Sequence, residues 1–235
     1  MIELYGMGSP NVAKVYIALE EMALPYRVHP VDVFTGEQFT DGFRALNPNS
    51  KVPVIVDPEG PDGAPCTLFE SGAILIYLAE KTGSFLATGG TGRIAALQWL
   101  MVQLTGQGPM SGQMVHFTRF APPDNDYAYA RYRTQVLTVY RNLDDRLAEN
   151  RFLAGDDYTI ADMATFPWSR HDIFREMVDA RYPHLRRWAG EVGERPAIVR
   201  AMAAAAEVRT QISSADTVPA AALDRFLARG EHAIG

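Results

Sequence analysis

The chain has 235 residues, 47% of them hydrophobic and 21% charged, a balance that is typical of a globular protein and excludes whole-chain disorder. Its formal charge of −6 comes without any basic stripe, which argues against nucleic acid as a partner. No apolar run reaches the roughly 18 to 20 residues of a membrane span, and the first residues lack the features of a signal peptide, so we expect a cytoplasmic protein with no membrane partner.

One cysteine and five histidines limit the redox and metal chemistry open to the chain. A single cysteine excludes an intrachain disulfide and a CxxC redox pair, so thiol chemistry must borrow its sulfur from another molecule. Cys66 falls in a turn rich in proline and glycine, and we interpret it as an incidental thiol. The histidines show none of the spacings of zinc sites, so we expect no bound metal.

The first predicted strand covers residues 2–5, where apolar and polar residues alternate. A glycine-rich loop then ends at Ser9, and apolar residues at helical spacing predict a helix over residues 12–19. Residues 26–31 read as a second strand, which would lie parallel to the first through a βαβ crossover. Residues 36–46 are expected to form a loop and a short helix.

Residues 51–78 predict a strand, a turn, a second strand and a helix in succession. The first of these strands, residues 51–56, is entered through Pro53, which has no N–H to give to a sheet. After a turn of proline and glycine the chain returns as a strand and then changes to helical spacing around Ile74. The order βαβ followed by ββα predicts a thioredoxin-like α/β domain over residues 1–84.

The remainder of the chain is predicted to be helical. Residues 86–92 are rich in glycine and threonine with little to bury, which is typical of a linker. Residues 92–212 carry only helical patterns and predict an all-α bundle. The expected helices cover residues 93–107, 127–149, 160–174, 183–195 and 197–212. Residues 213–235 form a tail, in which we expect a short surface helix.

Thr159 and Asp162 mark the start of one of these helices. Their spacing is that of a capping box, in which the threonine caps the helix and the carboxylate of the acid accepts a hydrogen bond from the backbone N–H of the cap residue. We therefore interpret Asp162 as structural rather than catalytic.

Val52, Glu70 and Ser71 together suit a ligand with an extended backbone and an α-amino acid head group. Val52 precedes Pro53 and would offer its own N–H and C=O to an extended ligand. Ser71 stands where a helix begins and suits a carboxylate, while the adjacent Glu70 suits an ammonium group. The alternative is that Ser71 only caps its helix and Glu70 is a solvated acid.

Ser9 and Asn11 are the candidates for activating a borrowed thiol. A free thiol titrates at about 8.5 to 9, so it needs hydrogen-bond donors aimed at the sulfur to become a thiolate at neutral pH. Ser9 offers a hydroxyl and Asn11 an amide, both beside the N-terminus of a predicted helix, which also favours an anion. The alternative is that either residue is an ordinary helix cap.

Several motifs resemble those of the cytosolic glutathione transferases, and more closely the bacterial Nu class and its fungal Ure2-like relatives. In the first domain they are Ser9-Pro10-Asn11, Gln38, Asn47-Pro48-Asn49, Val52-Pro53 and the run from Phe69 to Ile74. In the second they are Gln98-Trp99-Leu100, Gly108-Pro109-Met110 and Tyr158 to Asp162. The resemblance spans nearly the whole chain and implies a homodimer with the glutathione transferase fold.

The resemblance also implies a role for each matching residue at a glutathione site. Asn11 would be the main donor to the glutathione sulfur, with Ser9 close by in place of the family's more common threonine. Gln38 and Lys51 would bind the glycyl end, Val52 with Pro53 would pair with the cysteinyl backbone, and Glu70 and Ser71 would hold the γ-glutamyl head. A solvated surface side chain is the alternative for Lys51.

A second substrate would bind against residues of the helical domain. Residues 116–120 interrupt the helical spacing and mix aromatic rings with a cation, as a pocket for an apolar or anionic group requires. The resemblance aligns Arg131 with an arginine that reaches a second glutathione in the Nu class. A surface ion pair is the alternative for Arg131.

The function implied is that of a glutathione-dependent enzyme, with glutathione as its co-substrate. The activated thiolate would attack a disulfide, or a small electrophile in a conjugation or thioether cleavage. The rival hypothesis is a non-catalytic binding or regulatory protein built on a glutathione transferase scaffold, because a fold does not fix a function.

Overall fold

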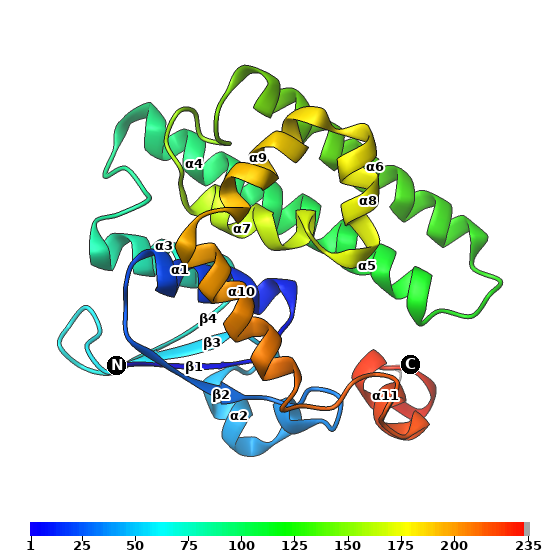
Figure 1. Cartoon of the computed structure of the whole chain (residues 1–235). Coiled ribbons are helices and arrows are strands. Elements are labelled where there is room, and N and C mark those ends of the chain that lie inside the picture. The colour runs from blue at the N-terminus through cyan, green and yellow to red at the C-terminus, as the bar shows by residue number, and fades with distance from the viewer. Residues whose placement is uncertain (233–235) are drawn as a thin grey trace. The chain divides into compact units, whose positions relative to one another are not determined.

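The computed structural model describes residues 1–232 and contains two compact units (Figure 1). The first unit joins Met1–Ile74 to the chain from Arg200 onward, and the second comprises Leu75–Val199. The first holds a four-stranded sheet and the second is helical, which confirms the expected fold class. Of the helices within residues 1–232, none has the length and apolar character that crossing a membrane requires.

The sheet of the first unit has the strand order β2-β1-β3-β4. Its strands are β1 (Ile2–Gly6), β2 (Tyr26–Pro30), β3 (Val54–Asp57) and β4 (Cys66–Phe69). Strand β1 pairs in parallel with β2, so that Leu4 lies opposite Val28, and antiparallel with β3, so that Leu4 lies opposite Ile55. Strand β4 pairs antiparallel with β3. The predicted order βαβ then ββα is therefore confirmed.

Helices pack on both faces of this sheet. Helix α1 (Pro10–Glu21) connects β1 to β2 and is buried along its length from Val12 to Leu19. Helix α2 (Asp41–Leu46) lies on the other side of the sheet (Figure 1), where Phe43 packs with valines of the 31–33 loop and of β3. Helix α3 (Ser71–Thr82) follows β4 directly. Glu37–Phe39 form the 3-10 turn η1 before α2.

The chain returns to the first unit within helix α10 (Pro196–Arg209), at Arg200. Two further elements follow, the short helix α11 (Ala220–Leu227) and the 3-10 turn η3 (Gly230–His232). Phe226 of α11 packs against Phe34 with ring centroids 4.9 Å apart and ring planes tilted by 53°, and it adds to the apolar cluster around Phe43. The short helix expected in the tail is present, and residues 233–235 lie outside the described residues.

The helices of the second unit are α4 (Gly90–Val102), α5 (Gly108–Arg119), α6 (Asp126–Glu149), α7 (Ile160–Ser169), α8 (Asp172–Arg181) and α9 (Pro183–Gly193). A π-helical turn, η2 (Gln103–Gln107), joins α4 to α5. Helical structure therefore runs on past residue 107, where we expected it to end.

Two helix predictions in this unit were wrong. Residues 116–119 do not interrupt a helix but form the last turn of α5, because Phe117 stacks on Tyr132 of α6 and this packing outweighs weak helix propensity. The helix expected over residues 160–174 is two helices: α7 ends at Ser169, and His171 caps α8 by accepting a hydrogen bond from the N–H of Ile173.

The capping box at the start of α7 is confirmed. The buried carboxylate of Asp162 accepts hydrogen bonds from the N–H of Thr159 at 2.9 Å, the N–H of Leu153 at 3.0 Å and the indole of Trp188 at 2.8 Å. These donors satisfy the hydrogen-bonding capacity of the buried carboxyl group and fix it within the core, which agrees with a structural role for Asp162.

Candidate functional site: the N-terminal ends of α1 and α3

Ser9 and Asn11 flank the start of α1. The backbone C=O of Ser9 accepts the first bonds of the helix, from Val12 at 3.1 Å and Ala13 at 2.9 Å, so Ser9 occupies the cap position. Its hydroxyl makes no capping hydrogen bond, and the side chain of Asn11 is exposed on the first turn. The alternative that the Ser9 side chain acts as an ordinary helix cap is therefore not supported, and its hydroxyl makes no bond to the N–H groups of α1.

Arg209 of α10 fixes the loop that leads to Ser9. Its Nε donates to the C=O of Gly8 at 2.6 Å. A Cβ at Gly8 would collide with the backbone oxygen of Ala205 and with the Arg209 side chain, so only glycine allows this approach. The support of this loop by α10 could not be predicted from the sequence, because a contact between residues so far apart leaves no local pattern.

Val52 lies just before β3, and its backbone is available for pairing. Neither its N–H nor its C=O takes part in a hydrogen bond within residues 1–232. Asn47, which is buried, holds the turn before it: its amide donates to the C=O of Lys51 at 2.7 Å and its oxygen accepts from Asn49 N–H at 2.9 Å. The Val52-Pro53 peptide bond is cis, and the Lys51 side chain is exposed.

Glu70 and Ser71 stand at the start of α3 in an arrangement that differs from the expected cap. Glu70, not Ser71, is the cap residue, because its C=O accepts from the N–H of Ile74 at 3.0 Å and α3 begins at Ser71. Glu70 has a φ of 69°, a left-handed backbone that is costly for a residue with a Cβ. The carboxylate of Glu70 is exposed, whereas Ser71 is 8% exposed.

Lys14 is a site residue that sequence reasoning missed. It lies one turn into α1 among apolar neighbours, is 2% exposed, and places its Nζ 3.4 Å from the Ser71 hydroxyl oxygen. Burial lowers the pKa of the Lys14 ammonium to about 7, against the opposing attraction of Glu70. A lysine inside an otherwise apolar helix run, residues 12–19, was the available signal.

Gln38 lies on η1 and is 3% exposed. Its amide nitrogen donates to the C=O of Val33 at 3.0 Å, while its amide oxygen is buried without a hydrogen-bond partner. A buried acceptor without a donor costs free energy, so Gln38 has capacity for a donor group that the described residues do not supply.

Cys66 is the first residue of β4, opposite Asp57 of β3, and is half-buried. The expectation that it would fall in a turn was wrong, because the sheet extends by one pair beyond the predicted strand. Within residues 1–232, no group of three or more His, Cys, Asp or Glu side chains has an arrangement that could hold a metal ion.

In the second unit, aromatic side chains of α5 and α6 lie together. The rings of Phe117 and Tyr132 stack at 5.3 Å, and His116 meets Phe117 edge-on at 5.1 Å. Arg131 precedes Tyr132 on α6 and is exposed. Among the described residues it has no salt-bridge partner, so the alternative of a surface ion pair finds no support.

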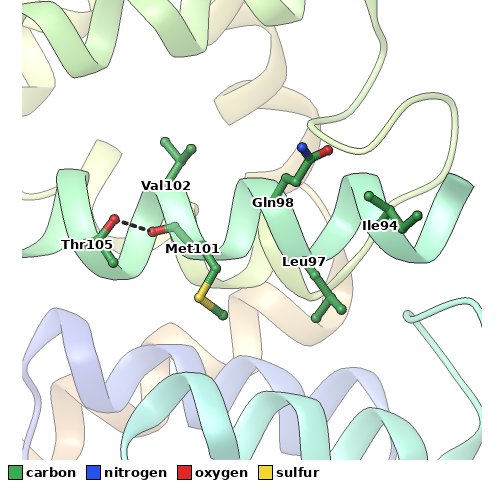
Figure 2. A pocket seen from close by; sticks show the side chains of 6 residues that line it. All are labelled: Ile94, Leu97, Gln98, Met101, Val102 and Thr105. Atoms are coloured by element: carbon green, nitrogen blue, oxygen red, sulfur yellow. Dashed lines mark hydrogen bonds between the residues drawn. The ribbon is translucent and has the colours of Figure 1, made fainter.

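Helix α4 carries an open apolar groove that continues into η2 (Figure 2). Its volume is about 540 Å³, and it is lined by Ile94, Leu97, Gln98, Met101, Val102 and Thr105. Figure 2 shows Leu97 and Met101 pointing to the same side of the helix. Ile94 and Met101 are 58% and 43% exposed, which is unusual for large apolar side chains. The lining holds no titratable or nucleophilic side chain that suits catalysis.

Comparison with known proteins places the chain in a family. Residues 8–81 match the model of the glutathione S-transferase N-terminal domain, and residues 109–196 match that of the C-terminal domain. The disulfide-bond oxidoreductase YfcG of Escherichia coli is 44% identical over 204 residues, which cover 86% of this chain and 94% of YfcG. The chain belongs to the glutathione S-transferase family. The resemblance inferred from the sequence motifs is confirmed.

Solved structures of glutathione S-transferases agree with this assignment. One from Pseudomonas fluorescens, with two glutathione molecules bound, is 42% identical with a TM-score of 0.82, covering 86% of this chain and 92% of its own. Another, from Pseudomonas putida with one glutathione disulfide bound per subunit, is 38% identical with a TM-score of 0.81, covering 86% and 90%.

Proposed function

We propose that this glutathione S-transferase activates the thiolate of glutathione for thiol–disulfide exchange, acting as a disulfide-bond reductase. One observation carries the proposal most: Glu70 holds an exposed carboxylate on a strained left-handed backbone beside the buried Ser71. Strain of this kind costs about 1 to 3 kcal/mol, and residues that carry it cluster at active sites and ligand-binding sites.

The residues of the first unit fit glutathione as a co-substrate. Ser71 and the N–H groups at the start of α3 suit the γ-glutamyl carboxylate, and Glu70 suits its ammonium. The unpaired backbone of Val52, beside Pro53, suits the cysteinyl unit. The spare amide oxygen of Gln38 suits an N–H of the glycyl end, and Lys51 suits its carboxylate.

The chemistry follows from Asn11 and Ser9. Their donors, at the N-terminus of α1, would stabilise a thiolate relative to the thiol. This thiolate attacks one sulfur of a disulfide substrate, forming a mixed disulfide with glutathione and releasing the other sulfur as a thiolate, which takes a proton. A second glutathione thiolate then attacks the mixed disulfide, yielding glutathione disulfide and the fully reduced substrate. The relatives crystallised with two glutathiones or with glutathione disulfide support this sequence.

Arg131 is our candidate for the residue that binds a carboxylate of the second glutathione. It is exposed, has no salt-bridge partner among the described residues, and follows the exposed Tyr129. Phe117 and Tyr132 provide an aromatic surface near it on the same unit. Conjugation to small electrophiles is the second candidate activity, favoured by this aromatic surface, since an apolar electrophile needs such contacts.

We also propose that the chain is a cytoplasmic homodimer, with residues 1–84 as the glutathione-binding domain and residues 92–212 as the second-substrate domain. The exposed apolar side chains of Ile94 and Met101 on α4 support self-association, since they gain from burial against a partner.

The proposed function is tested by binding and turnover together. Glutathione at millimolar concentration should raise the melting temperature, because it binds the folded state. Reduction of a small disulfide by glutathione and addition of glutathione to an aryl halide should then be assayed side by side. An unchanged melting temperature and no turnover in either assay would favour a non-catalytic protein on this scaffold.

A further inference from the structure

Burial of the Lys14 ammonium group costs free energy, and the surrounding residues offset little of that cost. A lysine that is 2% exposed has lost nearly all of its hydration, and within residues 1–232 its Nζ makes a single hydrogen bond, the 3.4 Å contact with the Ser71 hydroxyl. An ammonium group has three N–H donors, so most of its capacity is unused. Such a group is retained where something else provides the missing negative charge.

The groups around Lys14 do not provide that charge in full. Glu70 is the titratable group that acts on Lys14 among the described residues, and its carboxylate is exposed to solvent, which weakens the attraction. Ser71 is neutral, and the N-terminus of α3 carries a partial positive charge that does not favour a cation. An anion at Ser71 would change this balance.

We propose that Lys14 is a positioning residue for the γ-glutamyl head: it orients the Ser71 hydroxyl toward the ligand carboxylate and takes up a proton when that carboxylate binds. The inference rests on the proposed glutathione site. By donating an N–H to the Ser71 oxygen, Lys14 leaves the Ser71 O–H free to donate to the carboxylate. The negative charge of the ligand then favours the ammonium form of Lys14.

Proton uptake follows from the state of Lys14 in the free protein. With a pKa near 7, about half of the Lys14 side chains are neutral at pH 7. Binding of an anion raises this pKa, so about 0.3 to 0.5 of a proton enters the protein for each ligand bound at pH 7. At pH 5.5 Lys14 is already charged, and the uptake should vanish.

The test is calorimetry of S-methylglutathione binding, which keeps the γ-glutamyl head but has no thiol to release a proton. Titrations in phosphate and in Tris, whose ionisation heats differ strongly, give the number of protons exchanged. We expect the wild type to take up about 0.3 to 0.5 of a proton at pH 7. Lys14→Met should bind about tenfold more weakly with no uptake, and Lys14→Arg, a fixed cation, should recover affinity without uptake.

The outcomes separate the two proposals. Binding by the wild type with heat that is independent of the buffer at pH 7 would overturn the inference alone. So would a Lys14→Met variant with the wild-type affinity and proton uptake. Failure of the wild type to bind S-methylglutathione would overturn the proposed function itself.

Discussion

Glu70 combines an exposed carboxylate, which favours ligand binding, with a left-handed backbone, which lowers the stability of the fold. The carboxylate suits the ammonium of an amino acid head group, whereas a φ of 69° is free of steric cost only for glycine. The residue therefore costs stability at the place where it would serve binding.

We predict that Glu70→Gly and Glu70→Ala separate these two effects. Both should weaken glutathione binding by about 1 to 3 kcal/mol, because both remove the charged partner of the ligand ammonium. Only Glu70→Gly should raise the free energy of unfolding, by about 1 kcal/mol, because only glycine relieves the backbone. Calorimetry and urea unfolding measure the two quantities. Equal stability in both variants would mean that the backbone of Glu70 is not strained.

Lys14 makes a second residue-scale prediction, about stability and pH. The lysine titrates near 10.5 when unfolded and near 7 when folded, so between these values the unfolded chain binds more protons and stability rises with pH. Below pH 7 the full cost of burying the charge remains. Lys14→Met should therefore raise the free energy of unfolding by about 3 to 5 kcal/mol at pH 6 but by only about 1 kcal/mol at pH 9.5.

Urea unfolding at the two pH values measures this difference. Lys51→Met is the matched control, since Lys51 is exposed and its loss should change stability little at either pH. An equal gain for Lys14→Met at pH 6 and pH 9.5 would show that Lys14 is not buried as an ammonium group.

At the scale of elements, the C-terminal segment (residues 210–232) supports loops of the first unit that carry site residues. The N–H of Ser213 donates to the Asp32 carboxylate at 2.8 Å, and Phe226 packs on Phe34. Asp32 and Phe34 lie in the loop that leads to Gln38. The Arg225 guanidinium lies over the ring of Phe39, next to Gln38, at 4.9 Å. The segment thereby holds the position of η1.

We predict that Phe226→Ala loosens this loop. Removing the ring leaves the Phe34 side of the apolar cluster unfilled, so hydrogen exchange in residues 32–39 should accelerate by about tenfold, while exchange in α7 stays unchanged. Tyr127→Ala is the control, because Tyr127 is an aromatic residue that is 80% exposed and unpacked. Unchanged exchange in residues 32–39 of the Phe226 variant would show that the segment does not support the loop.

The elements also show what a sequence can predict. Strand β1 followed from period-two alternation and α1 from helical spacing, and the capping box followed from the local pattern Thr159 to Asp162. The break between α7 and α8 was missed, because it depends on a histidine acting as a cap. The start of α3 and its neighbour Val52 could be identified as a site, but the left-handed Glu70 and the buried Lys14 depend on packing between distant segments.

At the scale of the whole molecule, we predict a homodimer in solution. Sedimentation at micromolar concentration should give twice the 26.0 kDa mass of one chain. The double substitution Ile94→Glu and Met101→Glu should give the mass of a single chain, because it places charges on the apolar face of α4. Val199→Glu, at a residue that is 57% exposed, is the control and should leave the mass unchanged. A wild-type mass of one chain would contradict the prediction.

The central claim is that the reactive sulfur belongs to glutathione and that the protein lowers its pKa. The Cys66→Ser variant has no thiol of its own, so its ultraviolet thiolate absorbance with bound glutathione reports only the ligand. Titrating this absorbance against pH should give a pKa of about 6.5 to 7.5, compared with about 8.5 to 9 for the free thiol. Adding Asn11→Ala should return the value toward that of the free thiol. A bound thiol that titrates like free glutathione in Cys66→Ser would contradict the account.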